Sequence, residues 1–497
     1  MTRRILVLLA VVLPILFVVV PADAAAPRTV ADTVGRELDA LAPPAAAYVV
    51  VAPDGTPTVG THGKGVTART PFVLGSLSKS FTALSVMQLV DRGKVALDQP
   101  VTAYLPWLRT ATPGRVPTIR QLLDQSSGLP TAAGVADVTH PGRTLEQRVR
   151  RIVGVTPTAV PGARFQYCNL NFATLGLVVQ TVSGQPYASY LRTNVLDPLG
   201  MSRTYTSIPQ ARTAGLVEAT VPWFGIHVRS PAADFPGALP DGYLVSTAED
   251  LGHYLTMQLG DGTYQGHELV SPASMRLLHQ RQVAISAADA DPHTDGYALG
   301  WYTGAVNGTP LVSHSGDVFG FHNDIGLLPG RHTALAVLTA QNSNLLANDD
   351  AYAAGLEVLA GQPAPAIGFF DHYRNRYLII DLVFAALLAL MAGRWVALIR
   401  RPRPRGARRA ALGLAGSVAA AGIVYVAVVY GLGHLIGFPL QPDLMLGGIP
   451  ELLVLTVLLA AYPILTSVLK TAVPGTRLRS AGERSSLSLP ALPGAAR

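Results

Sequence analysis

Four side chains in this sequence are of types that can activate one another in covalent catalysis: Ser76, Lys79, Tyr167 and His314. Ser76 and Lys79 stand three residues apart at the start of an apolar-periodic stretch, which predicts a helix running to about Arg92 and places both on one face. A serine hydroxyl is a weak nucleophile until a base takes its proton, and a lysine is such a base only when its pKa is lowered. The spacing therefore predicts a lysine-activated serine, with the free N–H groups of the helix start available to an anion.

The residues around these side chains resemble the motifs of the serine β-lactamase and penicillin-binding-protein family, in particular class C β-lactamases, D,D-carboxypeptidases and related esterases. Residues 72–81 (FVLGSLSKSF) resemble the nucleophile segment, and Tyr167-Cys168-Asn169 resembles the Y-x-N element. His314-Ser315-Gly316 resembles the K-T-G strand motif, with histidine in the lysine position. The resemblance covers about residues 40–360.

The resemblance implies a catalytic role for three residues. Ser76 would attack the substrate carbonyl, and Lys79 and Tyr167 would handle its proton. Because a phenol has an ordinary pKa near 10, Tyr167 would relay a proton only if a neighbouring cation such as Lys79 favours its anion.

The resemblance also implies a substrate-binding set. Asn169 would hold a substrate amide and the catalytic lysine. His314, Ser315 and Gly316 would line the substrate, with His314 binding a carboxylate or passing protons near neutral pH. The backbone N–H groups of Ser76 and Asp317 would form the oxyanion hole.

Two competing interpretations of nearby residues are less favoured. Cys168 could be a thiol nucleophile, but the middle position of Y-x-N accepts small residues generally. Asp317, His322 and Asp324 follow no compact ligand spacing, so we expect neither a metal nor another cofactor.

Two segments depart from the family pattern. Asp124-Gln125 stands where histidine is frequent, and Asp241-Gly242-Tyr243 stands where Gly-Gly is frequent. Neither departure removes a catalytic group, but with both of them present the sequence does not determine how wide the cleft is.

The elements that must position these residues follow an α+β pattern. A helical stretch is predicted at about 28–41, a hairpin at 47–63, mostly helices from Ser76 to about Leu278, strands at 298–303, 310–314, 323–328 and 333–339, and a helix at 349–359. Strands at both ends predict one antiparallel sheet. The resemblance implies that the sheet and a helical lobe meet at a cleft.

The composition indicates more than a soluble globule. Of 497 residues, 49% are apolar and only 14% are charged, and the single cysteine excludes a disulfide framework. The net charge of +7 arises largely from arginines that flank apolar spans, which favours membrane topology over a nucleic-acid partner.

The chain divides into segments that predict a membrane-tethered, exported domain. They are a signal sequence at 1–26, the catalytic domain at 27–365, a linker at 366–376, transmembrane spans at 377–399, 410–436 and 446–468, a basic cytoplasmic loop at 400–409, and a cytoplasmic tail at 469–497. The basic loop places the domain on the extracytoplasmic side of the cell membrane. Asp381 and Glu451 could indicate transport or a proton relay, but both lie near the predicted outer ends of their spans, where an interfacial location costs little, so a structural role is favoured.

These observations favour a serine hydrolase that forms an acyl-enzyme on amides or esters, such as D-Ala peptides, β-lactams or simple esters. The expected partners are a small-molecule or peptide substrate and the lipid bilayer, and the oligomeric state stays open. The alternatives are a penicillin-recognising sensor without turnover, or a transporter with an inactive outer domain.

Overall fold

The computed structural model describes residues 29–472 except 111, 113–115, 139–141, 288–289, 344–347, 401–406, 433–444 and 446–448. The predicted signal sequence and most of the predicted tail lie outside the described residues. The chain forms two compact units. The first runs to Asp381 and takes in the start of the last helix as far as Leu453, and the second contains Leu382–Leu432 and the chain from Val454 onward.

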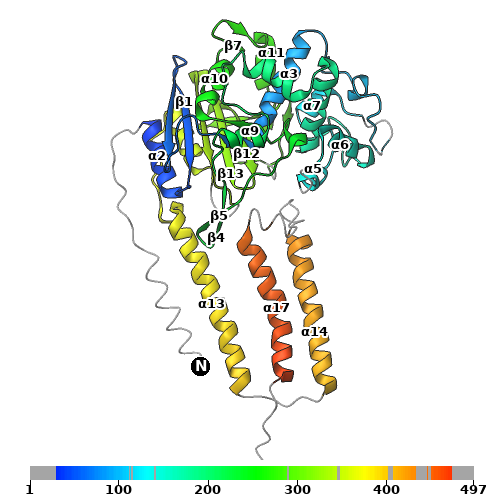
Figure 1. The fold of residues 1–497 in the computed structure, drawn as a ribbon, viewed down its shortest axis with the longest axis vertical. Helices are drawn as coiled ribbons and strands as arrows, with labels where there is room; N and C mark the ends of the chain where they lie inside the picture. Colours follow the sequence, from blue (N-terminus) through cyan, green and yellow to red (C-terminus); the bar gives the residue numbers. More distant parts are fainter. Residues whose placement is uncertain are drawn as a thin grey trace, which may run out of the picture. The chain divides into compact units, whose positions relative to one another are not determined.

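An eight-stranded antiparallel sheet forms the centre of the first unit (Figure 1), in the order β2-β1-β14-β13-β12-β11-β10-β9. Its strands are β1 (Ala46–Val51), β2 (Pro57–His62), β9 (Val283–Ala284), β10 (Thr294–Tyr297), β11 (Tyr302–Val306), β12 (Thr309–Val318), β13 (Phe321–Leu328) and β14 (Thr333–Thr339). β1 pairs with β14, so the two ends of the domain sequence meet in one sheet.

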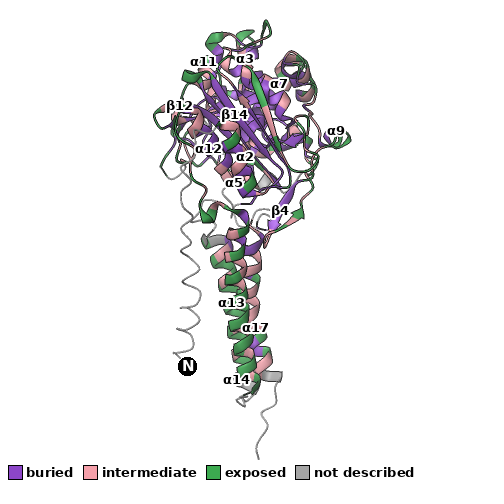
Figure 2. Cartoon of the chain, turned by 90° about the vertical axis from the view of Figure 1, so that its left-hand side faces the viewer, coloured by how far each residue is buried: buried purple, intermediate pink, exposed green. Residues whose placement is uncertain are grey.

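Helices cover both faces of this sheet, which is why its central strands are buried throughout (Figure 2). On one face, α2 (Val30–Leu41) and α12 (Asp350–Leu359) share a cluster that includes Leu38, Leu335 and Leu356. The other face carries the larger apolar core, to which α3, α7 and α10 contribute. Burial of apolar side chains on both faces is the main stabilising term for such a layered domain.

The helical lobe and its connections supply the remaining elements. The helices are α3 (Ser78–Asp91), α4 (Ile119–Leu123), α5 (Thr131–Val138), α6 (Leu145–Arg150), α7 (Asn169–Ser183), α8 (Tyr187–Leu191), α9 (Ile208–Thr213), α10 (Ala248–Leu259) and α11 (Pro272–His279). Three two-stranded sheets join them: β3 (Phe72–Val73) with β6 (Val245–Ser246), β4 (Thr220–Trp223) with β5 (Ile226–Arg229), and β7 (Thr263–Tyr264) with β8 (His267–Glu268).

The predicted α+β class is confirmed, and the first part of one predicted strand is wrong. The sequence predicts an extended segment at 298–303, but Ala298 donates its N–H to the Trp301 carbonyl across a turn, and only residues 302–303 are extended, as the start of β11. Gly300 has φ +81°, a left-handed conformation that favours glycine, so the chain reverses there between β10 and β11.

Three of the described helices are long and apolar enough to cross a membrane, and most of their residues belong to the second unit. α13 (Tyr373–Arg400), α14 (Ala407–Val426) and α17 (Pro450–Ala472) have mean hydropathies of 2.2, 2.2 and 2.3 over their candidate spans. Within this unit the Trp395 indole donates to the Thr466 hydroxyl at 2.8 Å, and the Ser417 and Ser467 hydroxyls lie 2.6 Å apart. Such hydrogen bonds are a recurrent means of joining helices in lipid.

Candidate active site

Ser76 lies in a short 3₁₀ turn, η2 (Gly75–Leu77), that runs directly into α3. The sequence predicts that Ser76 lies in the first turn of an α-helix, whereas in the structure this turn has the tighter 3₁₀ conformation. Lys79, in the first turn of α3, brings its Nζ to 2.8 Å from the Ser76 Oγ. The spacing of three residues therefore produces the expected contact between the hydroxyl and the amine.

The Lys79 side chain is completely buried. Its Nζ also donates to the backbone carbonyl of Asp241 at 2.6 Å. Burial lowers the pKa of Lys79 to about 7, Arg148 acts in the same direction, and Asp241 opposes it. A large fraction of this amine is therefore neutral near pH 7 and able to accept a proton.

Asp241 and Arg148 form an ion pair beside this lysine. The Arg148 guanidinium donates to both Asp241 carboxylate oxygens at 2.6 and 3.0 Å, and both side chains are buried. A bidentate pair fixes the residues that hold it. It thereby fixes the Asp241 carbonyl on which Lys79 rests.

Tyr167 reaches the same hydroxyl from the segment before α7. Its OH donates to Ser76 Oγ at 2.9 Å, and the Lys79 Nζ lies 4.9 Å from the centre of its ring. Burial raises the pKa of Tyr167 well above its usual value, and Tyr302 adds to the effect. Desolvation of the phenol thus outweighs any favourable effect of Lys79 on its anion, and Tyr167 is a neutral hydrogen-bond donor.

Gln125 holds the Tyr167 segment from both sides. The Gln125 carbonyl accepts from Gln166 N at 2.8 Å, and its side-chain oxygen accepts from Cys168 N at 3.0 Å. Gln125 adopts φ +61°, which is strained for a residue other than glycine. This position is one of the two departures from the family pattern.

His314 lies in β12 and is buried in an aromatic cluster. Its Nδ1 is 2.6 Å from the Ser315 carbonyl, so that nitrogen carries the proton, and its Nε2 accepts from the Tyr297 OH at 3.1 Å. Burial, reinforced by Lys79, lowers the pKa of His314 to about 3. The ring is therefore neutral, which does not favour the cationic form considered for carboxylate binding, and both of its nitrogens have partners. The substrate-binding role of His314 stays a prediction.

The strand edge beside Ser76 is free of a neighbouring strand. β12 pairs with β11 only as far as Ser313, whereas it pairs with β13 up to Val318. Gly75 and Gly316 meet at this edge so closely that a Cβ added to Gly75 would lie 2.5 Å from the Gly316 carbonyl carbon. The same added atom would lie 2.6 Å from Asp317 N, and one on Gly316 would lie 3.0 Å from Ser76 N. The two nitrogens expected to form an oxyanion hole therefore flank this contact.

Two predicted binding residues make no hydrogen bond to the catalytic group among the described residues. The Asn169 side-chain oxygen is buried without a partner. Lys79, which Asn169 was expected to hold, contacts the Asp241 carbonyl instead. Ser315 is exposed and lines a cavity of about 320 Å³ together with Asp324 and Tyr352.

The residues of the competing interpretations are placed differently. Cys168 is fully buried, and burial raises the pKa of its thiol to about 11.

His322 lies between two carboxylates, with Nδ1 2.7 Å from Asp317 and Nε2 2.8 Å from Asp324. Burial lowers the pKa of His322, but the two carboxylates outweigh burial and raise it well above its usual value. Both ring nitrogens are thus occupied by carboxylates.

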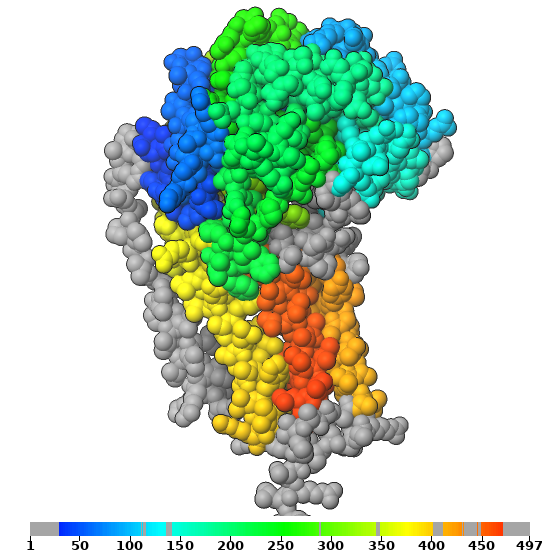
Figure 3. Space-filling model, viewed as in Figure 1, coloured from blue at the N-terminus to red at the C-terminus, as the bar shows by residue number. Residues whose placement is uncertain are grey.

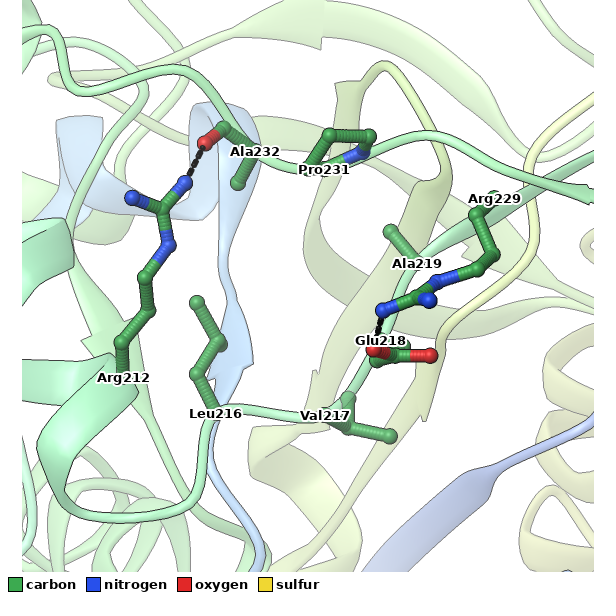
Figure 4. A pocket seen from close by; sticks show the side chains of 8 residues that line it. All are labelled: Arg212, Leu216, Val217, Glu218, Ala219, Arg229, Pro231 and Ala232. Atoms are coloured by element: carbon green, nitrogen blue, oxygen red, sulfur yellow. Dashed lines mark hydrogen bonds and ion pairs between the residues drawn. The ribbon is translucent and has the colours of Figure 1, made fainter.

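A separate cavity of about 350 Å³ contains none of the predicted site residues (Figure 4). Arg212 and Arg229 line it, but Arg212 donates to the Ala232 carbonyl and Arg229 pairs with Glu218. Both guanidinium groups therefore have protein partners, and no serine, cysteine or lysine is among the described residues that line the cavity.

Sequence reasoning missed three residues that shape the site: Asp241, Tyr297 and Gln125. Asp241 and Gln125 belong to the two segments that depart from the family pattern, and these departures were the available signal. Tyr297 carried no signal, because only the register of β10 in the sheet brings it to His314.

Comparison with known proteins connects this geometry to a family. A model of the β-lactamase family matches residues 39–360. Protein flp of Staphylococcus aureus is 27% identical over 329 residues, which are 65% of this chain and 63% of that protein, so the chain spans less than two thirds of its length. Penicillin-binding protein 4 of Amycolatopsis lactamdurans is 30% identical over 285 residues, covering 56% of this chain and 74% of that protein.

Solved structures agree with this assignment. The octameric penicillin-binding protein homologue from Pyrococcus abyssi superposes with a TM-score of 0.59 at 26% identity, over 67% of this chain and 77% of its own. D-alanine carboxypeptidase AmpC from Burkholderia cenocepacia, at 21% identity, shares the fold with a TM-score of 0.52 over 63% of this chain and 94% of its own. With the match spanning well over half of its length, this chain belongs to the β-lactamase family.

Proposed function

We propose that the domain is a serine hydrolase that works through an acyl-enzyme on amide or ester substrates. The observation that supports this most directly is the position of Ser76 Oγ, which lies within hydrogen-bond distance of both Lys79 Nζ and the Tyr167 OH. A nucleophile in contact with a base and a second proton-carrying group is the arrangement that acyl transfer requires.

In the first step, neutral Lys79 accepts the Ser76 proton while Oγ forms a bond to the substrate carbonyl carbon. The N–H groups of Ser76 and Asp317 stabilise the negative charge that develops on the carbonyl oxygen. The C–N or C–O bond of the substrate then breaks, and the leaving group takes a proton from the Lys79–Tyr167 pair. The neutral Lys79 amine then deprotonates a water molecule that attacks the ester, and the resulting ammonium returns a proton to Ser76 Oγ as the acyl–oxygen bond breaks.

The substrate chain would lie along the edge of β12 past Ser313, which pairs with no strand among the described residues. The unpartnered Asn169 oxygen can accept an N–H from an amide substrate. The names of the relatives favour D-alanyl peptides or β-lactams, since they include penicillin-binding proteins and a D-stereospecific amidohydrolase from Streptomyces. Ser315 and Gly316 would complete the binding edge.

We also propose that the three apolar helices are membrane spans that hold this domain on the extracytoplasmic side of the cell membrane. Their length and hydropathy support membrane association. The orientation rests on the arginines of residues 400–409, which favour the cytoplasmic side.

The test is hydrolysis by the purified full chain in detergent, using a chromogenic cephalosporin, a D-Ala-D-Ala peptide and a p-nitrophenyl ester. Ser76→Ala should abolish turnover of whichever substrate is hydrolysed, whereas Ser202→Ala, at an exposed serine, should not. A stable adduct of a fluorescent penicillin without turnover would instead indicate the sensor. A folded protein with neither labelling nor hydrolysis would contradict the proposal.

A further inference from the structure

The β4–β5 hairpin presents apolar side chains to solvent at one end of the first unit. Trp223 pairs with Ile226 across a two-residue turn in which Phe224 and Gly225 both have positive φ, at +47° and +72°. Positive φ at both central residues is the geometry of a tight hairpin turn. Side chains alternate along β5, so Ile226 and Val228 point to one face, and they are 69% and 39% exposed.

The opposite face of the hairpin is fixed to the start of α13. The His227 ring stacks on Tyr373 with centroids 5.1 Å apart and planes at 9°. A Cβ added to Gly225 would make a tight contact of 3.1 Å with the Cβ of Tyr377, and the φ of +72° also favours glycine here. Figures 1 and 3 show the green hairpin segment beside the yellow first turns of α13.

A carboxylate at the start of α17 holds the same turn. The Glu451 carboxylate accepts the Phe224 N–H at 2.7 Å, and its side chain is 3% exposed. This contact lies within the first unit. The hairpin turn is thus attached to the first residues of two candidate membrane spans.

Two further aromatic side chains are exposed immediately before α13. Phe369 and Phe370 are 41% and 55% exposed, and their rings meet edge to face at 5.5 Å. They precede Tyr373, the first residue of an apolar 28-residue helix, by four and three positions. Removal of apolar area from water is favourable by about 25 cal/mol per Å², so covering these two rings would be stabilising.

The charge of the hairpin turn fits a lipid surface. The segment from Trp223 to Val228 contains no Asp, Glu, Lys or Arg. Burial lowers the pKa of His227, so this ring is neutral near pH 7. Aromatic and aliphatic side chains without charge, next to the point where a helix enters a bilayer, are typical of the membrane–water interface.

We propose that Ile226, Val228, Phe369 and Phe370 form an interfacial patch that inserts into the lipid surface of the membrane that α13 enters. The domain then rests on the bilayer at two points, the hairpin and the start of α13, and is not free to rotate about a single tether. This proposal does not depend on the chemistry at Ser76.

The experiment uses the full chain in phosphatidylcholine–phosphatidylglycerol vesicles. Cys168 is the only cysteine and is buried, so Ile226→Cys can be labelled specifically with the fluorophore NBD. Vesicles with and without 5-doxyl-phosphatidylcholine report contact with lipid, and aqueous iodide reports contact with water. Val160→Cys, at a residue 55% exposed in the helical lobe, is the matched control, and Val228→Cys repeats the test at a second patch position.

The label at position 226 should be quenched by doxyl lipid about twofold or more and protected from iodide, since interfacial side chains lie some 5–10 Å below the headgroups. The label at position 160 should show the reverse. Equal behaviour at the two positions overturns the proposal. Protection from iodide without doxyl quenching also overturns it and assigns the patch to a protein, such as a second copy of this chain.

Discussion

The amine of Lys79 lies 2.8 Å from the Ser76 hydroxyl, and it reaches that position with its side chain fully withdrawn from solvent. Burial disfavours the charged amine, and this is the property that a lysine base requires. The same desolvation keeps Tyr167 a neutral phenol and His314 a neutral imidazole. Of these three groups, only Lys79 has its pKa near neutrality.

The first prediction concerns pH. The pKa of Lys79 is lowered to about 7, and only the neutral amine accepts a proton, so kcat/KM should rise with pH and level off above about pH 7. Lys79→Arg, which cannot be deprotonated, should lower kcat/KM by about 10²–10⁴-fold. The pH–rate profile of the full chain on its best substrate measures both effects.

Two controls identify the group responsible. Lys94→Ala, at an exposed lysine just beyond α3, should keep the profile. His314→Gln should lower the rate but leave the midpoint near pH 7, because His314 has its pKa at about 3. A midpoint that moves with His314 would contradict the assignment of the base.

The second prediction is that the same lysine destabilises the fold. Its pKa is about 7 in the folded protein and 10.5 in an ordinary environment, so between these values the unfolded chain binds a proton that the folded chain does not. The free energy of unfolding should therefore increase with pH across this window, by at most about 1.4 kcal/mol per pH unit from this group.

Lys79→Met should remove that slope and stabilise the protein at pH 7 while abolishing activity. Urea unfolding at pH 7, 8 and 9 compares the unmodified protein with Lys79→Met. Lys94→Ala should keep the dependence of the unfolding free energy on pH that the unmodified protein shows. An identical slope in Lys79→Met would show that Lys79 does not carry a lowered pKa.

The third prediction concerns the buried ion pair next to the site. Asp241→Asn leaves the Arg148 guanidinium buried with one carboxylate lost, which costs about 3–5 kcal/mol when an ion pair is buried. Glu146→Gln, in the same helix as Arg148, breaks the exposed pair with Arg150 and should cost under about 1 kcal/mol. Urea unfolding distinguishes the two, and equal losses would contradict a structural role for the buried pair.

The contact between Ser76 and Lys79 could be predicted from sequence because it is local. Residues three apart near a helix start lie on one face whatever the rest of the fold does. The hairpin β1–β2 and the helix α2 were likewise close to their predicted ranges, since turn residues and apolar periodicity are local signals.

The electrostatics of the site could not be predicted, because they depend on burial. A histidine in β12 can be cationic or neutral. Burial of His314 in the aromatic cluster with Tyr297 lowers its pKa and so favours the neutral form. The support of Lys79 by the Asp241 carbonyl joins residues 162 positions apart, for which one sequence gives no signal. The strand predicted at 298–303 begins only at Tyr302, because Gly300 adopts a left-handed conformation in the turn before β11.

The fourth prediction separates a serine from a cysteine mechanism. Burial raises the pKa of the Cys168 thiol to about 11, so it is protonated and unreactive at neutral pH. Iodoacetamide should not inactivate the native protein, and Cys168→Ala should retain activity within about twofold, since a buried thiol acts as a small apolar group. Loss of activity on thiol alkylation, measured beside Ser76→Ala, would contradict the assignment of Ser76.

The last prediction tests the oxyanion hole through the glycine contact at the strand edge. A Cβ added to Gly316 would lie 2.1 Å from the Leu74 carbonyl oxygen, so the edge of β12 has to move away from the Ser76 turn. The Asp317 N–H then loses its position next to Ser76 N, and removal of one such donor typically lowers kcat by about 10²–10³-fold.

Gly330→Ala, where an added Cβ meets nothing within 4 Å, is the matched control and should keep full activity. Because kcat depends on the transition state, Gly316→Ala should lower kcat more than it raises KM for a slow substrate. Unchanged kcat in a folded Gly316→Ala protein would mean that the oxyanion is stabilised elsewhere.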